Sequence, residues 1–185
     1  MDDKILVRKQ ILQLCKTIDP IDKKVKEAKF LEHILPIVNV ANSVCVYRAY
    51  AWELDLSQLI TYCLKYAKLL YQPIAYRHTP IMGISTYVSE KTDIFELVAG
   101  ELNNDIQWYN VDLILLPLVA VDRLGHRLGK GGGYYDYTLA GIRNYAKAPI
   151  LCGVGFACQK VESIPYDDWD IKLDYFVSEH GITKF

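Results

Sequence analysis

The sequence of 185 residues lacks the features of several broad protein classes. No apolar stretch approaches the length of a membrane span, and the N-terminus carries charges where a secretory signal needs an apolar run. Its 21 lysines and arginines nearly balance 22 aspartates and glutamates, so there is no excess of positive charge for nucleic acid or an anionic membrane. These absences predict a cytoplasmic protein with neither a nucleic-acid nor a membrane partner.

The cysteine and histidine patterns that build disulfide frameworks or metal sites are also missing. The five cysteines form no C-x-x-C pair, and their odd number does not suit a disulfide framework, so we expect buried free thiols. The four histidines show neither an i,i+4 pair nor an H-E-x-x-H pattern. A metal site built from histidines is therefore not expected.

The chain has no internal repeat, no low-complexity tract and no linker rich in proline, glycine or serine. About half of its residues are apolar (51%), which is enough for one well-buried core at this length. We therefore predict one domain that spans residues 1–185.

Helix and strand patterns alternate along the chain. Helices are expected from the capping residues Asp2 and Asp3 onward, at 22–35 up to Pro36, at 56–64, and in the stretch that ends at 142; strands are expected at 43–50, 69–74, 111–120, 149–156 and, as the last, 173–179; a short hairpin or meander is expected within 80–110. This order predicts a three-layer α/β/α sandwich with a Rossmann-like, mostly parallel sheet and helices on both faces.

The expected first helix places Lys4 and Arg8 one turn apart on the same side. Two such cations repel each other slightly, so the simpler interpretation is a solvated helix face. The alternative is a clamp for an anion. The helix pattern alone favours the solvated face.

A glycine-rich stretch follows the apolar strand at 111–120. Residues 127–136, here called the glycine loop, read RLGKGGGYYD. They match neither G-x-x-x-x-G-K-[ST] nor G-x-G-x-x-G, which disfavours a GTPase, a P-loop ATPase and a dinucleotide dehydrogenase. Backbone N–H groups flanked by Arg127 and Lys130 could still cradle phosphate. A tight crossover that simply needs glycine explains the stretch equally well.

Asp136, at the end of the glycine loop, would repel a phosphate unless a cation such as Mg²⁺ lay between them. A second carboxylate would help to hold the metal, and four aspartates crowd a later stretch: Asp167, Asp168, Asp170 and Asp174. A helix cap with a solvated acidic turn would account for them as well. Charge alone does not choose among the four.

Two long runs, residues 115–140 and 153–179, resemble the C-terminal half of the 5-formyltetrahydrofolate cyclo-ligases, also called methenyltetrahydrofolate synthetases. The N-terminal half is similar in a K-x-x-x-R at Lys4 and Arg8 and an E-[LIV]-[DE] at residues 53–55. The resemblance implies an enzyme that uses ATP and Mg²⁺ to convert 5-formyltetrahydrofolate, with or without a polyglutamate tail, to 5,10-methenyltetrahydrofolate, releasing ADP and phosphate. It also implies a monomer or a weakly associating dimer.

The resemblance further implies a role for individual residues. It assigns catalysis to Arg127, Lys130 and Tyr134, and ATP binding to Lys4, Arg8, Arg127, Leu128, Gly129, Lys130, Gly131, Gly132, Gly133, Tyr134 and Tyr135. It assigns the folate substrate to Tyr50, Glu53, Asp55, Lys130, Gly131, Gly132, Gly133 and Tyr134, and the metal to Asp136 and Asp170.

Three positions depart from the family pattern. Lys130 stands where tyrosine or arginine is usual, Tyr137 where many members have arginine, and Leu118 where glycine commonly follows the strand proline. Two alternative functions are a small-molecule kinase on the same fold and a non-catalytic folate- or nucleotide-binding protein. Catalysis is favoured by the joint presence of the cations and carboxylates that the family uses: Lys4, Arg8, Arg127, Asp136 and Asp170.

Overall fold

The computed structural model describes residues 3–76, 78–88 and 106–185. Its α-helices and 3-10 helices are α1 (Asp3–Lys16), α2 (Pro20–Val40), α3 (Ser57–Lys65), η1 (Trp108–Asn110), α4 (Tyr134–Thr138), η2 (Ile142–Asn144) and η3 (Ala157–Gln159). Its strands are β1 (Ser43–Cys45), β2 (Leu69–Ala75), β3 (Met82–Thr86), β4 (Leu113–Pro117), β5 (Ala120–Val121), β6 (Arg127–Leu128), β7 (Ile150–Val154), β8 (Tyr175–Ser178) and β9 (Gly181–Lys184).

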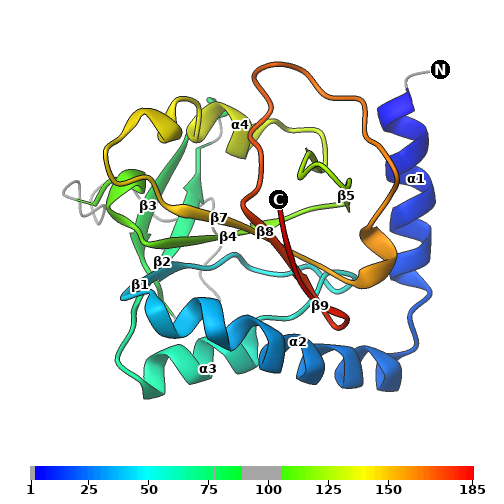
Figure 1. The fold of residues 1–185 in the computed structure, drawn as a ribbon, viewed down its shortest axis with the longest axis horizontal. Coiled ribbons are helices and arrows are strands. Elements are labelled where there is room, and N and C mark those ends of the chain that lie inside the picture. Colours follow the sequence, from blue (N-terminus) through cyan, green and yellow to red (C-terminus); the bar gives the residue numbers. More distant parts are fainter. Residues whose placement is uncertain (1–2, 77, 89–105) are drawn as a thin grey trace.

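Seven strands form one sheet in the order β3-β2-β1-β4-β7-β8-β9, and β5 pairs with β6 in a separate small hairpin (Figure 1). The pairs from β2 through β8 are parallel, and the edge strands β3 and β9 are antiparallel to their neighbours. The expected mostly parallel sheet is therefore confirmed. The expectation that residues 173–179 form the last strand was wrong, because β9 follows β8 after a two-residue turn and begins at Gly181, which has a φ of +119°.

Alternate residues of β4 point to opposite faces of the sheet, as strand geometry requires. Leu113 and Leu115 belong to one core with α2 and α3, which lie along one face of the sheet (Figure 1). Ile114 and Leu116 belong to a second core on the other face, which short helical segments and loops cover. Helical segments thus flank both faces, as expected, but the three longest helices, α1, α2 and α3, all contribute to the first of these cores.

Helix α2 runs through Pro36 to Val40, although the sequence predicted that it would end before the proline. A proline inside a helix removes one backbone hydrogen bond. Ile37 and Val38, which follow it, are buried against the sheet, and this burial offsets the loss. Asp19 is the N-cap of this helix, and its carboxylate accepts hydrogen bonds from the N–H groups of Ile21 and Asp22.

Two other expected elements are shorter than the sequence suggested. The strand expected at residues 43–50 covers only Ser43–Cys45; Val46 still donates a backbone hydrogen bond to Tyr71 of β2, and residues 47–50 are not in a strand. The helix after the glycine loop covers only Tyr134–Thr138. Within residues 80–110, where a hairpin or meander was expected, the described part holds one strand, β3, which pairs antiparallel with the preceding β2; residues 89–105 lie outside the described part of the chain, so the rest of this expectation stays a prediction.

Leu118, one of the departures from the family pattern, is buried beside Gly153 of β7. A Cβ atom at position 153 would lie 2.8 Å from Leu118 Cδ2, so the glycine provides the space that the larger side chain fills. In the described residues, no helix is both long and apolar enough to cross a membrane.

The buried carboxylate of Asp122 fixes the turn between β5 and β6. It accepts hydrogen bonds from the backbone N–H groups of Leu124, His126 and Ile164, and it lies 2.9 Å from His126 Nδ1. Burial raises the pKa of Asp122, but the hydrogen bonds from His126 and Leu124 outweigh it, so the pKa lies below the ordinary range. This turn determines where β6, and with it Arg127, begins.

We predict that Asp122→Asn lowers the free energy of unfolding by about 2–3 kcal/mol at neutral pH. The amide NH₂ group of asparagine would face backbone N–H groups that now donate to the carboxylate, and it cannot accept their hydrogen bonds. Since the folded pKa of Asp122 is depressed, its contribution is present above the unfolded pKa and is lost as pH falls through the folded pKa. Denaturant unfolding should therefore show the difference from wild type shrinking below about pH 4. The exposed Asp168→Asn is the control; equal losses in both variants would contradict this account.

Candidate active site

A cavity of about 480 Å³ lies at the carboxyl end of β4, between α1, the chain that follows β1, the β2–β3 hairpin and the glycine loop. Ligands of open α/β sheets bind at this end of the strands. The described residues that line it are Lys4, Arg8, Tyr47, Arg48, Tyr50, Pro73, Ala75, Met82, Pro117, Arg127, Leu128, Gly129, Lys130, Gly131, Gly132, Gly133, Tyr134, Tyr135, Asp136 and Asp170.

The glycine loop needs its glycines for two different reasons. Gly131 and Gly133 have φ values of +109° and +66°, a backbone conformation that other residues rarely adopt. Gly132 has no such angle, but a Cβ atom there would lie 2.8 Å from a ring carbon of Tyr134. Gly131 and Gly133 therefore shape the backbone, and Gly132 leaves room for the ring of Tyr134.

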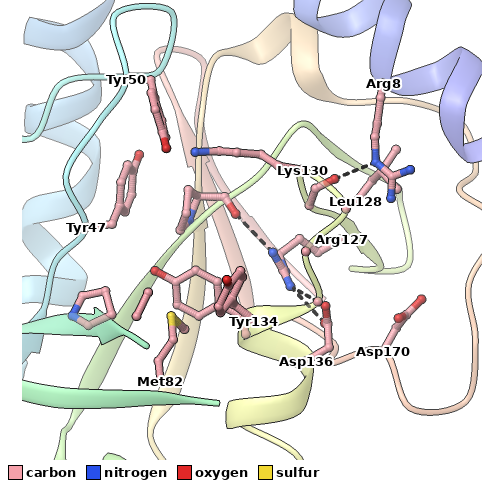
Figure 2. Close-up of a pocket in the computed structure, with 18 of the residues that line it drawn as sticks. Arg8, Tyr47, Tyr50, Met82, Arg127, Leu128, Lys130, Tyr134, Asp136 and Asp170 are labelled. Atoms are coloured by element: carbon pink, nitrogen blue, oxygen red, sulfur yellow. Dashed lines mark hydrogen bonds and ion pairs between the residues drawn. The ribbon is translucent and has the colours of Figure 1, made fainter. Parts of the chain in front are cut away.

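Helix α1 is joined to the glycine loop and to the C-terminal acidic turn by two cations. Arg8 Nε donates to the carbonyl oxygen of Gly129 at 2.9 Å (Figure 2). Lys4 Nζ lies 2.8 Å from Asp167 and 3.2 Å from Asp170, and the hydrogen bond with Asp167 is the main cause that raises the pKa of Lys4. Both side chains are partly buried and line the cavity.

Arg127 is the buried cation of the site, with only 7% of its surface exposed. Its Nη2 contacts both carboxylate oxygens of Asp136, at 2.9 and 3.1 Å, and its Nη1 donates to the carbonyl oxygen of Pro117 (Figure 2). Asp136 also accepts a hydrogen bond from the N–H of Ile171. The pair therefore connects β4, β6, α4 and the C-terminal turn at one point.

Of the four C-terminal aspartates, Asp170 is the one that lines the cavity. Asp167 binds Lys4, Asp168 is exposed, and Asp174 accepts a hydrogen bond from the N–H of Leu151 outside the cavity lining. Among the described residues, no group of three or more histidine, cysteine, aspartate or glutamate side chains could hold a metal ion. The donor chemistry of Asp136 and Asp170 still fits Mg²⁺, which usually takes one or two carboxylates and completes its shell with water and substrate phosphates.

The opposite end of the cavity is apolar and aromatic. Tyr47, Tyr134 and Met82 form its wall together with Pro73 and Ala75 of β2. Burial raises the pKa of Tyr47, so its hydroxyl stays neutral and donates to the Leu54 carbonyl oxygen. Tyr134 was expected at the site from the family resemblance. The other wall residues, Tyr47, Pro73, Ala75 and Met82, could not be predicted from sequence, because such side chains look the same whether they face a core or a cavity.

Lys130 joins the glycine loop to the segment after β1. Its Nζ lies 2.8 Å from Glu53 Oε1, 3.7 Å from the centre of the Tyr50 ring and 5.4 Å from that of Trp52. Glu53 is buried, and it is not part of the described lining of the cavity.

The remaining expected positions lie outside the main cavity. Asp55 lines a neighbouring cavity and accepts hydrogen bonds from Ser57 at the start of α3. Tyr137 is exposed. Four of the five cysteines are buried, as expected, and Cys158 is exposed.

Comparison with known proteins confirms the family resemblance. The model of the 5-formyltetrahydrofolate cyclo-ligase family matches residues 1–179. The chain is 31% identical over 156 residues to the 5-formyltetrahydrofolate cyclo-ligase of Escherichia coli (strain K12), a match that covers 81% of this chain and 85% of the relative. A relative of the same description from Haemophilus influenzae is 27% identical over 175 residues, which cover 90% of this chain and 92% of the relative.

Solved structures agree with the observed fold. The 5,10-methenyltetrahydrofolate synthetase of Aquifex aeolicus superposes with a TM-score of 0.78 at 27% identity, covering 98% of this chain and 92% of the other. A 5,10-methenyltetrahydrofolate synthetase from Mycoplasma pneumoniae gives a TM-score of 0.77 at 21% identity, covering 97% and 99%. This second match supports the fold alone.

The two kinds of glycine in the loop predict two different responses to alanine. Gly131→Ala should lower the free energy of unfolding by about 1–3 kcal/mol, because it forces a side-chain-bearing residue to keep a positive φ. Gly132→Ala should cost less, because the partly exposed Tyr134 ring can move aside. Denaturant unfolding measures both, and an equal or larger loss for Gly132→Ala would contradict the assignment.

Proposed function

The chain belongs to the 5-formyltetrahydrofolate cyclo-ligase family, and we propose that the cavity beside the glycine loop is where it converts 5-formyltetrahydrofolate to 5,10-methenyltetrahydrofolate with ATP and Mg²⁺. The observation that carries this assignment is that one cavity unites a cationic end, two carboxylates and an aromatic end. These are the parts that a triphosphate, its metal ion and a pterin each require. No observation favours a kinase or a non-catalytic binding protein.

The cationic end is the proposed phosphate site. Lys4 and Arg8 approach it from α1, and Arg127 and Lys130 come from the glycine loop. Gly129, Gly131, Gly132 and Gly133 expose backbone with no side chain in the way, so N–H groups can approach phosphoryl oxygens. Cations and N–H donors fixed before the reaction stabilise the charge that develops on a transferring phosphoryl group.

Asp136 and Asp170 are the proposed holders of Mg²⁺. Bound Mg²⁺ would supply charge neutralisation at the phosphates and orientation of the transferring group. In the ligand-free protein the two carboxylates are instead neutralised by Arg127 and Lys4. These ion pairs hold both carboxylates in place at the cavity.

The aromatic end is the proposed folate site. Tyr47, Tyr50 and Tyr134 offer faces to a flat pterin ring, and Glu53 offers a carboxylate to its N–H groups. Asp55 stays a prediction from the family resemblance, and its place in the neighbouring cavity does not favour it.

The chemistry follows from the poor leaving ability of a formyl oxygen. The formyl oxygen takes the terminal phosphoryl group of ATP, ADP leaves, and the oxygen becomes part of a phosphate ester. The neighbouring folate nitrogen then attacks the formyl carbon, loses its proton and expels phosphate. Both reacting parts of the second step lie in one bound molecule, which can contribute about 7 kcal/mol or more. No protein nucleophile is required, so the cysteines need no catalytic role.

The direct test is incubation of the purified protein with 5-formyltetrahydrofolate, ATP and Mg²⁺ while the absorbance of methenyltetrahydrofolate and the release of phosphate are followed. We expect both products in equal amounts, and neither without Mg²⁺. Phosphate release without methenyl product would indicate another substrate.

Arg8→Ala tests the cation clamp. Loss of one charge-assisted hydrogen bond costs about 1.5–3 kcal/mol, so the KM for ATP should rise roughly 10-fold to 100-fold. Lys9→Ala removes an adjacent, exposed charge from the same helix and is the matched control. If the two variants had the same KM for ATP, the solvated-face interpretation of α1 would be right.

Asp136→Asn tests the metal site. The variant is nearly isosteric and keeps an oxygen that can accept from Arg127, so the protein should stay folded, although the lost countercharge lowers its stability. Turnover at moderate Mg²⁺ should fall far more, by about 100-fold or more. Turnover is measured against Mg²⁺ concentration, with circular dichroism as the check on folding. Wild-type turnover in this variant at every Mg²⁺ concentration would remove Asp136 from the metal site.

A further inference from the structure

Glu53 is a buried carboxylate with incomplete hydrogen bonding. One of its oxygens, Oε2, accepts a hydrogen bond from the N–H of Tyr50 at 2.9 Å. The other, Oε1, has no hydrogen-bond partner among the described residues, although Lys130 Nζ lies only 2.8 Å away in an ion pair without hydrogen-bond geometry. The side chain of Glu53 is 4% exposed, and a buried charge is costly unless a countercharge is near. Lys130 is that countercharge.

Lys130 lies between Glu53 and the cavity. Its side chain is 40% exposed and lines the cavity, whereas Glu53 does not. In Figure 2 the lysine extends from the glycine loop toward Tyr50, away from Arg127, Asp136 and Asp170. The ammonium group of Lys130 therefore pairs with Glu53 near the aromatic end, although the backbone of Lys130 belongs to the glycine loop at the cationic end.

We propose that Lys130 is an exchangeable cation that neutralises Glu53 in the ligand-free protein and turns to the nucleotide phosphates when a pterin takes its place on Glu53. The inference rests on the proposed function of the cavity. It adds a coupling between the two substrates, in which the folate site controls one of the cations of the phosphate site.

The exchange has a physical basis on both sides. The aminopyrimidinone edge of a pterin carries adjacent N–H donors, which match the two oxygens of a carboxylate and would satisfy Oε1. Lys130 has a flexible four-carbon stem and is flanked by Gly129 and Gly131, so its ammonium can move while the loop backbone keeps its shape. Phosphates bound along that backbone would be the nearest strong acceptors for the released cation.

A cation cannot serve Glu53 and the phosphates at once, and this makes the coupling positive. ATP that binds first must compete with Glu53 for Lys130, whereas ATP that binds after folate finds the lysine released. Because linkage is reciprocal, each substrate tightens the binding of the other by the same factor. ATP is thereby bound most tightly when the folate that accepts its phosphoryl group is present.

The test measures binding of a non-hydrolysable ATP analogue with Mg²⁺ by calorimetry in the absence of folate. Glu53→Gln removes the competing charge and keeps the shape, so it should tighten binding about 5-fold or more. The same substitution made in a Lys130→Met protein should give no such gain. An equal gain in both backgrounds would show a general effect of removing a negative charge, and no gain in either would show no competition; both results overturn the exchange.

A second arm uses only the lysine variant and so does not depend on the folding of Glu53→Gln. Saturating 5-formyltetrahydrofolate should tighten binding of the analogue to wild type and to Lys147→Met, a surface lysine paired with Asp112, but not to Lys130→Met. Lys130→Arg keeps a cation and should retain part of the coupling. Independent binding of both ligands to wild type would overturn the exchange alone, whereas binding of neither ligand would overturn the proposed function as well.

Discussion

The buried guanidinium of Arg127 is the interaction on which the rest of the site depends. A buried charge must be paired, and Arg127 meets this requirement with the carboxylate of Asp136 and the carbonyl oxygen of Pro117. These partners come from the end of the central strand β4 and from α4, and Asp136 reaches the C-terminal turn through Ile171. The end of β4, the glycine loop and the C-terminal acidic turn are therefore held in one arrangement by the protein's own contacts.

Charge balance organises the remainder of the cavity in the same way. Lys4 is paired with Asp170, and Lys130 with Glu53, so each carboxylate proposed to meet a ligand already has a cation beside it. Binding then becomes an exchange of partners and not a desolvation of isolated charges, which would cost far more. Phosphates and Mg²⁺ would replace the protein's own cation–carboxylate contacts at one end, and a pterin would replace Lys130 at the other.

The sequence was informative where one physical signal dominates. The apolar run at residues 111–120 predicted a strand where β4 lies, and the alternation of helix and strand patterns predicted the mostly parallel sheet. It was misleading where tertiary burial decides: Ile37 and Val38 carry α2 past Pro36, and β9 forms because β8 offers it an edge. The aromatic wall and the ion pair between Lys130 and Glu53 have no local pattern in the sequence, since both depend on which segments the fold brings together.

The most direct test of the account is a crystal structure of the protein with 5-formyltetrahydrofolate, Mg²⁺ and a non-hydrolysable ATP analogue. The account predicts the phosphates between α1 and the glycine loop, the metal ion on Asp136 and Asp170, and Lys130 turned from Glu53 to the phosphates. Phosphates bound elsewhere, with all three ion pairs of the ligand-free protein intact, would contradict it.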